Sequence, residues 1–383
     1  MSADLFLKNP TPEEIKEQLT HNSLEWRGPL STEAYFRRED VLANQDLTRS
    51  GGLTSWILAR NLPDGSRQAV CSCETIRKRA FLALASTGKV QDVTCYGVAS
   101  VFTIPEHRGK GYASTMFTNL EKWMDEEGRG KGGFSVLYSD VGKEFYAKHG
   151  WTPKQSAHVT LLVGGAEMGN VDGVRWLKEE DLPALCKRDE AIVKARLERL
   201  VSQGKNAVAI CPDLKTLQWQ QAREAFLSKE LYGKTPEIQG ALFKTGTGKD
   251  VWCYWTRWWY NADVKQTKGN TMHILRLVVD EPEYDDIAAS DKGVEEVQAG
   301  ETVKAVAALL RAALQEAKES NMEDVQIWNP SSTTLAAARL LEDKAEVVHR
   351  EKESIASFRW CDDKLNDIGD SIVWTAVEKY SWC

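Results

Sequence analysis

Apolar and polar residues alternate with two different periods along the first 165 residues of the chain. A period of two is typical of a half-buried strand, and a period of 3.6 is typical of an amphipathic helix. The patterns predict, in order, a strand, two helices, three strands, a helix, a strand, a short helix and a strand. This order predicts an α/β protein with a mixed sheet covered by helices.

Local signals support two of these helices. In "TPEEIKEQLTHN", Thr11 is the expected N-cap, Pro12 occupies the first helical position and Glu14 the third, a favourable helix start. The run 111–127 places seven residues on one helical face, namely Tyr112, Ala113, Met116, Phe117, Leu120, Trp123 and Met124. We expect this face to pack against the sheet.

The glycine-rich, polar stretch "VGGAEMGNVDG" separates these elements from the rest of the chain. Such composition is typical of a domain boundary, and we predict two domains, residues 1–165 and 172–383. The second part later repeats a strand–helix–strand–helix order, from "TMHILRLVVD" to "STTLAAARLLED". We interpret it as a degenerate copy of the first fold, in which an acidic loop replaces a glycine turn.

Composition narrows the class of protein. The chain has 383 residues, a formal net charge of −7 and 42% hydrophobic residues, so a nucleic-acid partner is not expected. No basic region with a long apolar run opens the chain, and no segment has the length needed to span a membrane. Eight cysteines form no CxxC pair and have no neighbouring histidine cluster. We therefore expect a cytoplasmic protein with reduced cysteines and no metal site.

The stretch "EHRGKGYAS" combines two glycines with basic residues at the start of the amphipathic helix. Glycines at a helix N-terminus are typical of a phosphate-binding turn. A Walker A loop is excluded because Lys110 is followed by Gly111 rather than by Ser or Thr. A dinucleotide fingerprint fits poorly, since no strand ending in Asp or Glu follows about 20 residues on.

A third pattern, Arg/Gln-x-x-Gly-x-Gly/Ala, is met by Arg108, Gly111 and Ala113. This turn resembles the pyrophosphate loop of the GNAT N-acetyltransferases. About 30 residues later, "LYSDVGKEFYAKHGW" resembles the second GNAT signature, a strand followed by a short helix. The resemblance covers about residues 1–165 and implies a GNAT fold with acetyl-CoA as co-substrate.

The resemblance also assigns the coenzyme site. In the family, backbone groups of the strand before the loop hold the pantetheine arm, and successive N–H groups of the loop hold the diphosphate. The residues at these positions are Val101, Phe102, Thr103, Arg108, Gly109, Lys110, Gly111, Tyr112, Ala113 and Ser114.

The second part of the chain is similar to a fungal group of GNAT proteins with a long C-terminal domain. The similarity rests on "HILRLV", "VQIWNP" and the terminal "EKYSWC". That group includes L-lysine N6-acetyltransferases, which implies a small amine acceptor, with free L-lysine first. Another amine (a polyamine, a xenobiotic or a protein lysine) and a non-catalytic acyl-CoA-binding scaffold remain alternatives.

Catalytic candidates follow from the resemblance and from the chemistry. Tyr146 matches the family tyrosine that hydrogen-bonds the coenzyme sulfur, and is the expected general acid; its alternative role is packing. A lysine amine, with a reference pKa near 10.4, needs a proton acceptor. Three carboxylates are candidates: Glu74, Asp140 and the α-carboxylate of Cys383, since in some multi-domain relatives the chain's own end is the base. Each has a structural alternative, for Cys383 a last strand that closes the second domain.

The segment "DVWCYWTRWWYN" concentrates aromatic residues. By strand alternation, Trp252, Trp258 and Tyr260 share one face, while Trp255 and Trp259 lie on the other. We predict core and interface packing rather than a cage for an ammonium. Glu230 and the loop around Asp285 and Asp286 are acidic enough to attract an amine, although such charge runs are mostly surface.

Overall fold

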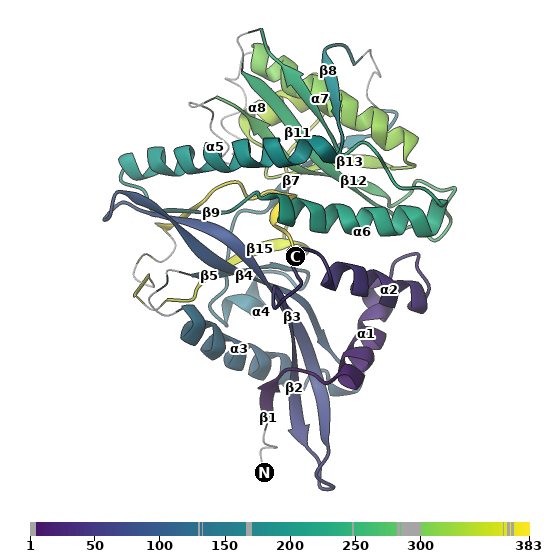
Figure 1. Ribbon diagram of the computed structural model, residues 1–383, viewed down its shortest axis with the longest axis vertical. Helices are drawn as coiled ribbons and strands as arrows, with labels where there is room; N and C mark the ends of the chain where they lie inside the picture. The colour runs from purple at the N-terminus through teal and green to yellow at the C-terminus, as the bar shows by residue number, and fades with distance from the viewer. Residues whose placement is uncertain are drawn as a thin grey trace.

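The computed structural model describes residues 5–128, 131, 133–165, 171–246, 249–281, 284, 300–362, 364–365, 368 and 371–383. In Figure 1 the molecule has two parts stacked along its long axis, with the N-terminus at one end and the C-terminus between the parts. The predicted acidic loop with Asp285 and Asp286 lies outside the described residues.

The first sheet has nine strands. Seven run in the order β1-β2-β3-β4-β5-β15-β6, while β9 pairs with β3 and β16 with β9. Their bounds are β1 (Leu5–Lys8), β2 (Leu53–Asn61), β3 (Arg67–Leu84), β4 (Lys89–Thr103), β5 (Phe134–Ser139), β6 (Thr152–Pro153), β9 (Ala207–Ile210), β15 (Ile355–Trp360) and β16 (Val373–Trp374).

The second sheet has seven strands in the order β14-β7-β13-β12-β11-β10-β8. Within it, β12 and β13 are parallel and their neighbours antiparallel. The bounds are β7 (Ala157–Leu162), β8 (Val174–Leu177), β10 (Gly240–Lys244), β11 (Asp250–Trp258), β12 (Thr271–Val279), β13 (Asp324–Trp328) and β14 (Val348–His349).

Helices cover both sheets. They are α1 (Pro12–Trp26), α2 (Thr32–Ala43), α3 (Tyr112–Gly128), α4 (Glu144–Ala147), α5 (Leu182–Ser202), α6 (Leu214–Tyr232), α7 (Glu301–Glu319) and α8 (Ser332–Arg339). Helix α3 packs on the outer face of the first sheet, and α7 and α8 pack on the outer face of the second. Helices α5 and α6 lie across the middle of the molecule, between the two sheets (Figure 1).

One hydrophobic core joins the two parts. It contains Ile76 and Val136 from the first sheet, Trp252 and Leu275 from the second, and Tyr380 from the end of the chain. Burying apolar surface of both sheets in one core stabilises them together. The mixed α/β class predicted from the sequence is thus confirmed.

The local signals are confirmed as well. The hydroxyl of Thr11 accepts a hydrogen bond from the Glu14 amide (3.3 Å), and the Glu14 carboxylate accepts one from the Thr11 amide (2.7 Å), which is a capping box. The predicted apolar face of α3 packs as expected, with Met116, Phe117, Leu120 and Met124 fully buried. The predicted order of elements is found in the first part, with the two-residue strand β6 added.

The two sheets exchange strands between the two parts of the chain. Strand β7, which precedes the predicted boundary, pairs with β13 in the second sheet, and β15 pairs with β5 in the first. Strand β9 likewise pairs with β3. The division at residues 165–172 stays a prediction about the chain, while in space each sheet contains strands from both sides of it.

Candidate functional site

The central strands β4 and β5 diverge half-way along their length. They pair in parallel from Cys95–Phe134 to Val98–Leu137, and the pairing stops there. At the point of divergence Ser100 has a φ of +52°, uncommon for a residue other than glycine. The pairing of β4 with β3 is also irregular, with Glu74 opposite Ala99 and Ser72 opposite Phe102. This bulge redirects the end of β4, where Val101, Phe102 and Thr103 follow.

The loop after β4 has the geometry of an anion site. Gly109 and Gly111 have φ values of +74° and +78°, in the region that favours glycine. No heavy atom lies within 4 Å of a Cβ built at either residue. Helix α3 begins directly afterwards at Tyr112, and the first N–H groups of a helix have no acceptor within it. The loop therefore fits a diphosphate held by backbone N–H groups.

Arg108 joins this loop to the end of β4. Its Nε donates to the Thr103 carbonyl (3.1 Å), and its guanidinium lies 5.3 Å from the centroid of the Phe102 ring. Lys110 donates to the Glu106 carbonyl at 2.8 Å, so a second cation stays beside the loop. The structure thus brings together the two groups of residues that the sequence assigns to the coenzyme, at the end of β4 and at the start of α3.

Tyr146 lies on α4, and its ring packs 5.0 Å from that of Phe117 on α3. Burial raises the pKa of its hydroxyl, and Cys73 and Asp140 add to the effect. No described residue forms a hydrogen bond with this hydroxyl. Tyr146 therefore keeps its proton at neutral pH, and it also packs in the core, as its alternative role requires.

Glu74 lies in β3 beside the bulge. Burial and the charge of Glu39 raise the pKa of its carboxyl group, and Ser100 opposes the rise, which leaves the pKa at about 7. A carboxylate with a pKa near neutrality is a better proton acceptor at pH 7 than an ordinary one.

Asp140 follows β5 and is exposed. Its Oδ1 accepts a hydrogen bond from the Ser354 amide at 2.9 Å, which fixes the loop that precedes β15. Its charge also raises the pKa values of Tyr146 and Tyr260. Asp140 is thus close enough to affect Tyr146. Its hydrogen bond to the loop before β15 also gives it a structural role.

The last residue of the chain lies against β4. The Sγ of Cys383 is 3.5 Å from the Val98 carbonyl oxygen, and a Cβ built at Gly97 would be 2.8 Å from that sulfur. Gly97 pairs with Ile76, two residues from Glu74 on β3. Because paired residues, and residues two apart, share a sheet face, Glu74 and Cys383 lie on the same face of the first sheet. The alternative of a closing strand is not what the structure has, since a 3-10 turn precedes Trp382.

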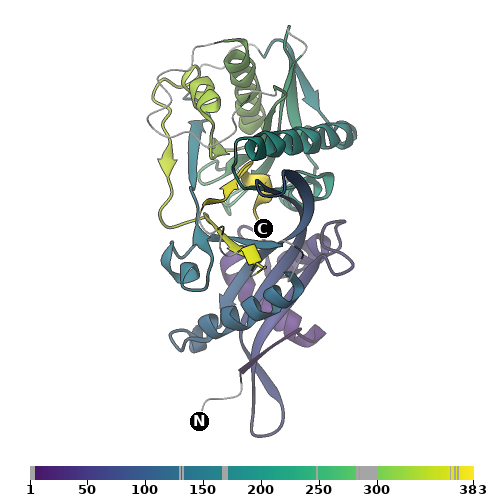
Figure 2. The same cartoon turned by 90° about the vertical axis from the view of Figure 1, so that its left-hand side faces the viewer.

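Each of the last residues of the chain has a partner of its own. The Glu378 carboxylate accepts from the Leu277 amide (2.7 Å) and pairs with Arg276, both on β12. Tyr380 donates to the carbonyl oxygen of Ile210 at the end of β9 (2.7 Å). The end of the chain is thus fixed to both sheets. Figure 2 shows it ending in the middle of the molecule.

Two further contacts hold the final turn. The buried Lys78 of β3 donates to the carbonyl oxygens of Ser381 (2.8 Å) and Trp382 (3.1 Å). Gln220 of α6 donates to the same Trp382 oxygen at 3.0 Å, and the hydroxyls of Tyr138 and Ser381 are 2.5 Å apart. These bonds hold the final turn, so that Cys383 lies against Val98 at the point where β4 and β5 stop pairing.

Family comparisons agree with this geometry. Residues 24–151 match the acetyltransferase (GNAT) family, and residues 158–383 match the LYC1 GNAT-like C-terminal domain. The second match covers more than half of the chain. The chain belongs to the LYC1-like GNAT family.

Curated proteins of two yeasts are similar to this chain. A protein of Yarrowia lipolytica named lysine acetyltransferase is 29% identical over 293 residues, covering 66% of this chain and 72% of that protein. The uncharacterized protein YGR111W of Saccharomyces cerevisiae is 24% identical over 425 residues, covering 99% of this chain and 98% of the relative.

Solved structures confirm the fold. A GCN5-related N-acetyltransferase from Anabaena variabilis has a TM-score of 0.51 at 12% identity, covering 93% of this chain and 73% of that one. The LYC1-like chain is accordingly an N-acetyltransferase of the acetyl-CoA-dependent GNAT superfamily, with a GNAT fold and a second GNAT-like domain.

Several residues of this LYC1-like site were not predicted from the sequence. Ser100 and the partners of the chain's end are among them. For Lys78 a signal exists, because it takes the inward position between Ile76 and Ala80 in an alternating strand. A charged residue at a core position of a strand needs a partner. Here its partners are carbonyl groups about 300 residues away in sequence.

The tryptophan-rich strand of the family's second domain divides as predicted. Trp255 and Trp259 pack in the core of the second sheet, and Trp252 packs in the core between the sheets. Trp258 faces the end of the chain: its ring is 4.9 Å from that of Trp382, and the Nζ of Lys379 lies 3.9 Å from its centroid. Trp258 thus packs on the chain's own end, and together with Trp328 and Trp382 its ring surrounds the ammonium of Lys379. Glu230 is on the surface and pairs with Arg37 at 2.7 Å.

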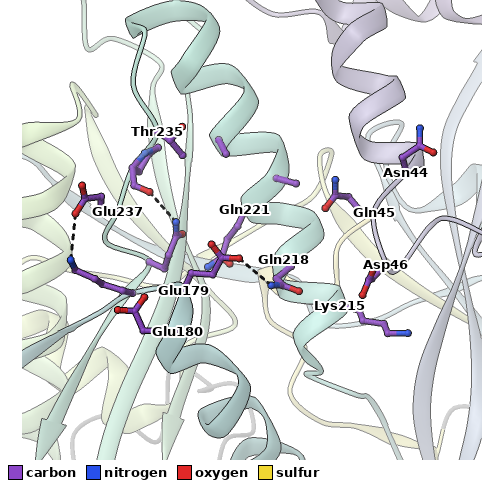
Figure 3. A pocket seen from close by; sticks show the side chains of 15 residues that line it. Asn44, Gln45, Asp46, Glu179, Glu180, Lys215, Gln218, Gln221, Thr235 and Glu237 are labelled. Carbon is purple, nitrogen blue, oxygen red and sulfur yellow. Dashed lines mark hydrogen bonds and ion pairs between the residues drawn. The ribbon is translucent and has the colours of Figure 1, made fainter.

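A pocket of about 640 Å³ lies apart from the coenzyme motif (Figure 3). Side chains of α6, such as Gln218 and Gln221, lie between those of Asn44–Asp46 and those around Glu179 and Glu237. None of the residues predicted for the site lines it. Within the described part of the chain, no group of three or more metal-ligating side chains is found, and no helix is long and apolar enough to cross a membrane.

Proposed function

We propose that the enzyme transfers the acetyl group of acetyl-CoA to the side-chain amine of free L-lysine. The observation that carries the proposal is the position of Glu74 beside the bulge of β4 and of Cys383 against Val98, where the pairing of β4 with β5 stops. The choice of lysine is supported by the Yarrowia lipolytica relative, which is named a lysine acetyltransferase.

Acetyl-CoA supplies a thioester carbonyl that an amine can attack directly. In the proposal, the loop 108–114 holds its diphosphate and the end of β4 aligns its arm, so that catalysis comes mainly from positioning. The Tyr146 hydroxyl is proposed to donate a proton to the leaving sulfur. Its raised pKa keeps the proton in place at neutral pH.

The acceptor must lose a proton before or during attack. Deprotonating a lysine amine at pH 7 costs about 4–5 kcal/mol, so a nearby base accelerates the reaction. We propose that the α-carboxylate of Cys383 accepts this proton, because the last residues of the chain are each fixed by contacts to the sheets and α6. Glu74 is the second candidate, supported by its pKa of about 7.

An amine panel tests the substrate. Purified enzyme and acetyl-CoA are incubated with L-lysine, a polyamine, a xenobiotic amine or a lysine-containing peptide, and free thiol is measured. The proposal expects thiol release with L-lysine well above that with the others. Preferred release with another amine would contradict the assignment of lysine.

Two variants at the end of the chain test the base. Appending two residues after Cys383 moves the carboxylate away, and turnover is expected to fall about 100-fold or more. Cys383→Ala keeps the carboxylate and removes only the thiol, so it is the matched control and is expected to retain most of the activity. Unchanged turnover in a folded, extended protein would exclude the terminal carboxylate and favour Glu74.

A further inference from the structure

Arg223 is a partly buried cation on α6. It lies near the end of the chain, beside Trp258. Its guanidinium lies 4.0 Å from the centroid of the Trp258 ring. Its Nη1 atom is buried and has no hydrogen-bond partner among the described residues. Part of its hydrogen-bonding capacity is therefore unused.

The partners of Arg223 differ from those of two other arginines near the middle of the molecule. Arg257 pairs with Glu224 and Glu316, and Arg276 pairs with Asp189 and Glu378. No described carboxylate forms an ion pair with Arg223. A buried charge without a counter-ion is costly, and burial together with the nearby Arg38 lowers the pKa of Arg223 to about 10. Glu39 is nearby but is bound to Arg38 at 2.5 Å.

Arg223 lies beside the end of the chain. The Trp258 ring under it also packs on Trp382, next to the end of the chain. Tyr260, whose ring centroid lies 5.7 Å from that of Trp258, is 48% exposed, so this side of the cluster is open to a ligand. Arg223 is separate from the cations of the coenzyme loop. Those are Arg108 and Lys110, which precede α3.

We infer that Arg223 binds the carboxylate of the acceptor, so that the enzyme selects an amino acid over a plain diamine. The inference rests on the proposed function, which supplies an amino acid as substrate. A guanidinium can form two parallel hydrogen bonds to a carboxylate, with Nη1 as one of the donors. The carboxylate also supplies the counter-ion that Arg223 lacks within the protein.

The test compares L-lysine with 1,5-diaminopentane, which is lysine without its carboxylate. In Arg223→Gln, kcat/KM for L-lysine is expected to fall about 10- to 100-fold, the effect of losing a hydrogen bond to a charged group. For 1,5-diaminopentane kcat/KM is expected to change less than about threefold. Arg223→Lys keeps the positive charge but cannot form the two parallel hydrogen bonds. Its kcat/KM for L-lysine is expected to lie between those of the wild type and Arg223→Gln. Arg37→Gln, at an exposed arginine of α2 paired with Glu230, is the matched control and should leave both values unchanged.

Equilibrium binding separates this inference from the proposed function. L-Lysine is titrated calorimetrically into the wild type and into Arg223→Gln, each loaded with CoA and shown to be folded by circular dichroism. Weaker binding of lysine by the variant alone supports the inference, even if the wild type proves unable to acetylate lysine. Equal losses for both amines, an unchanged preference, or a higher KM for acetyl-CoA in Arg223→Gln would each overturn it.

Discussion

Burial acts on two ionisable side chains of the site in the same direction, with different chemical results. It raises the pKa of Tyr146 further above neutrality, so this hydroxyl keeps its proton. It raises the pKa of Glu74 to about 7, so this carboxyl group can exchange a proton at neutral pH. At the scale of single residues, desolvation thus keeps the Tyr146 hydroxyl protonated and brings the titration of Glu74 close to neutral pH.

Removing the hydroxyl of Tyr146 tests the first of these roles. Tyr146→Phe keeps the ring that packs on Phe117, so the fold and the coenzyme loop should be unaffected. We expect kcat to fall about 10²–10⁴-fold, as for loss of a general acid, while the Kd for CoA changes little. The measurement is steady-state turnover together with CoA titration. A fall in CoA affinity with normal turnover of the bound complex would refute the assignment.

Glu74 makes a prediction about stability. The folded pKa of about 7 exceeds the ordinary value of 4.5, so between these pH values the folded state holds more protons than the unfolded state. The contribution of Glu74 to the free energy of unfolding therefore decreases as pH rises from 4.5 to 7. Glu74→Gln cannot ionise and should gain on the wild type between pH 5 and pH 8, by up to about 3 kcal/mol.

Urea unfolding of both proteins at pH 5 and pH 8 measures this gain. Taking the difference between variant and wild type removes the contributions of the other titrating groups. A difference that does not change with pH would show that Glu74 is not desolvated in the folded protein.

At the scale of elements, the coenzyme loop joins the end of β4 to the start of α3 through two glycines in left-handed conformations. Both glycines have free space around them. What a larger residue would disturb here is therefore the backbone conformation rather than the packing. The direction of the loop N–H groups depends on that conformation.

Gly111→Ala should thus weaken coenzyme binding. We expect a destabilisation of about 1–2 kcal/mol, the cost of an L-residue in the left-handed region, and a Kd for acetyl-CoA raised about tenfold or more. Gly65→Ala is a matched control, because Gly65 has a φ of +82° and equally free space but lies between β2 and β3. The control should lose similar stability and bind acetyl-CoA normally; equal affinities for the two variants would count against the loop.

The sequence was informative wherever a local rule applied. The capping box at Thr11, the apolar face of α3 and the glycine loop follow from neighbouring residues, and the structure has all three. The bulge at Ser100 and the contact of Lys78 with Ser381 do not, because they depend on chain segments that meet only after folding. The same holds for the strands that change sheets, since a strand pattern indicates a buried face but not the partner strand.

At the scale of the whole molecule, the exchange of strands couples the two parts of the chain. Strand β15 lies between β5 and β6 of the first sheet, and β9 pairs with the far end of β3. Strand β7 pairs in return with β13 and β14. The end of the chain adds contacts to both sheets, through Lys78 on β3 and Arg276 on β12. The proposed catalytic site therefore depends on both parts being folded.

This coupling predicts that the protein unfolds as one unit. Separate unfolding of the second part would remove β9 and β15 from the first sheet, and would leave β5 without the neighbour to which it is paired from Phe134 to Ser139. Exposed strand edges and a divided core would make such an intermediate unfavourable. We expect a single calorimetric transition whose calorimetric and van't Hoff enthalpies agree, with loss of activity at the same temperature. Two resolved transitions, or activity that is lost well before the main one, would show that the second part can unfold while the first sheet persists.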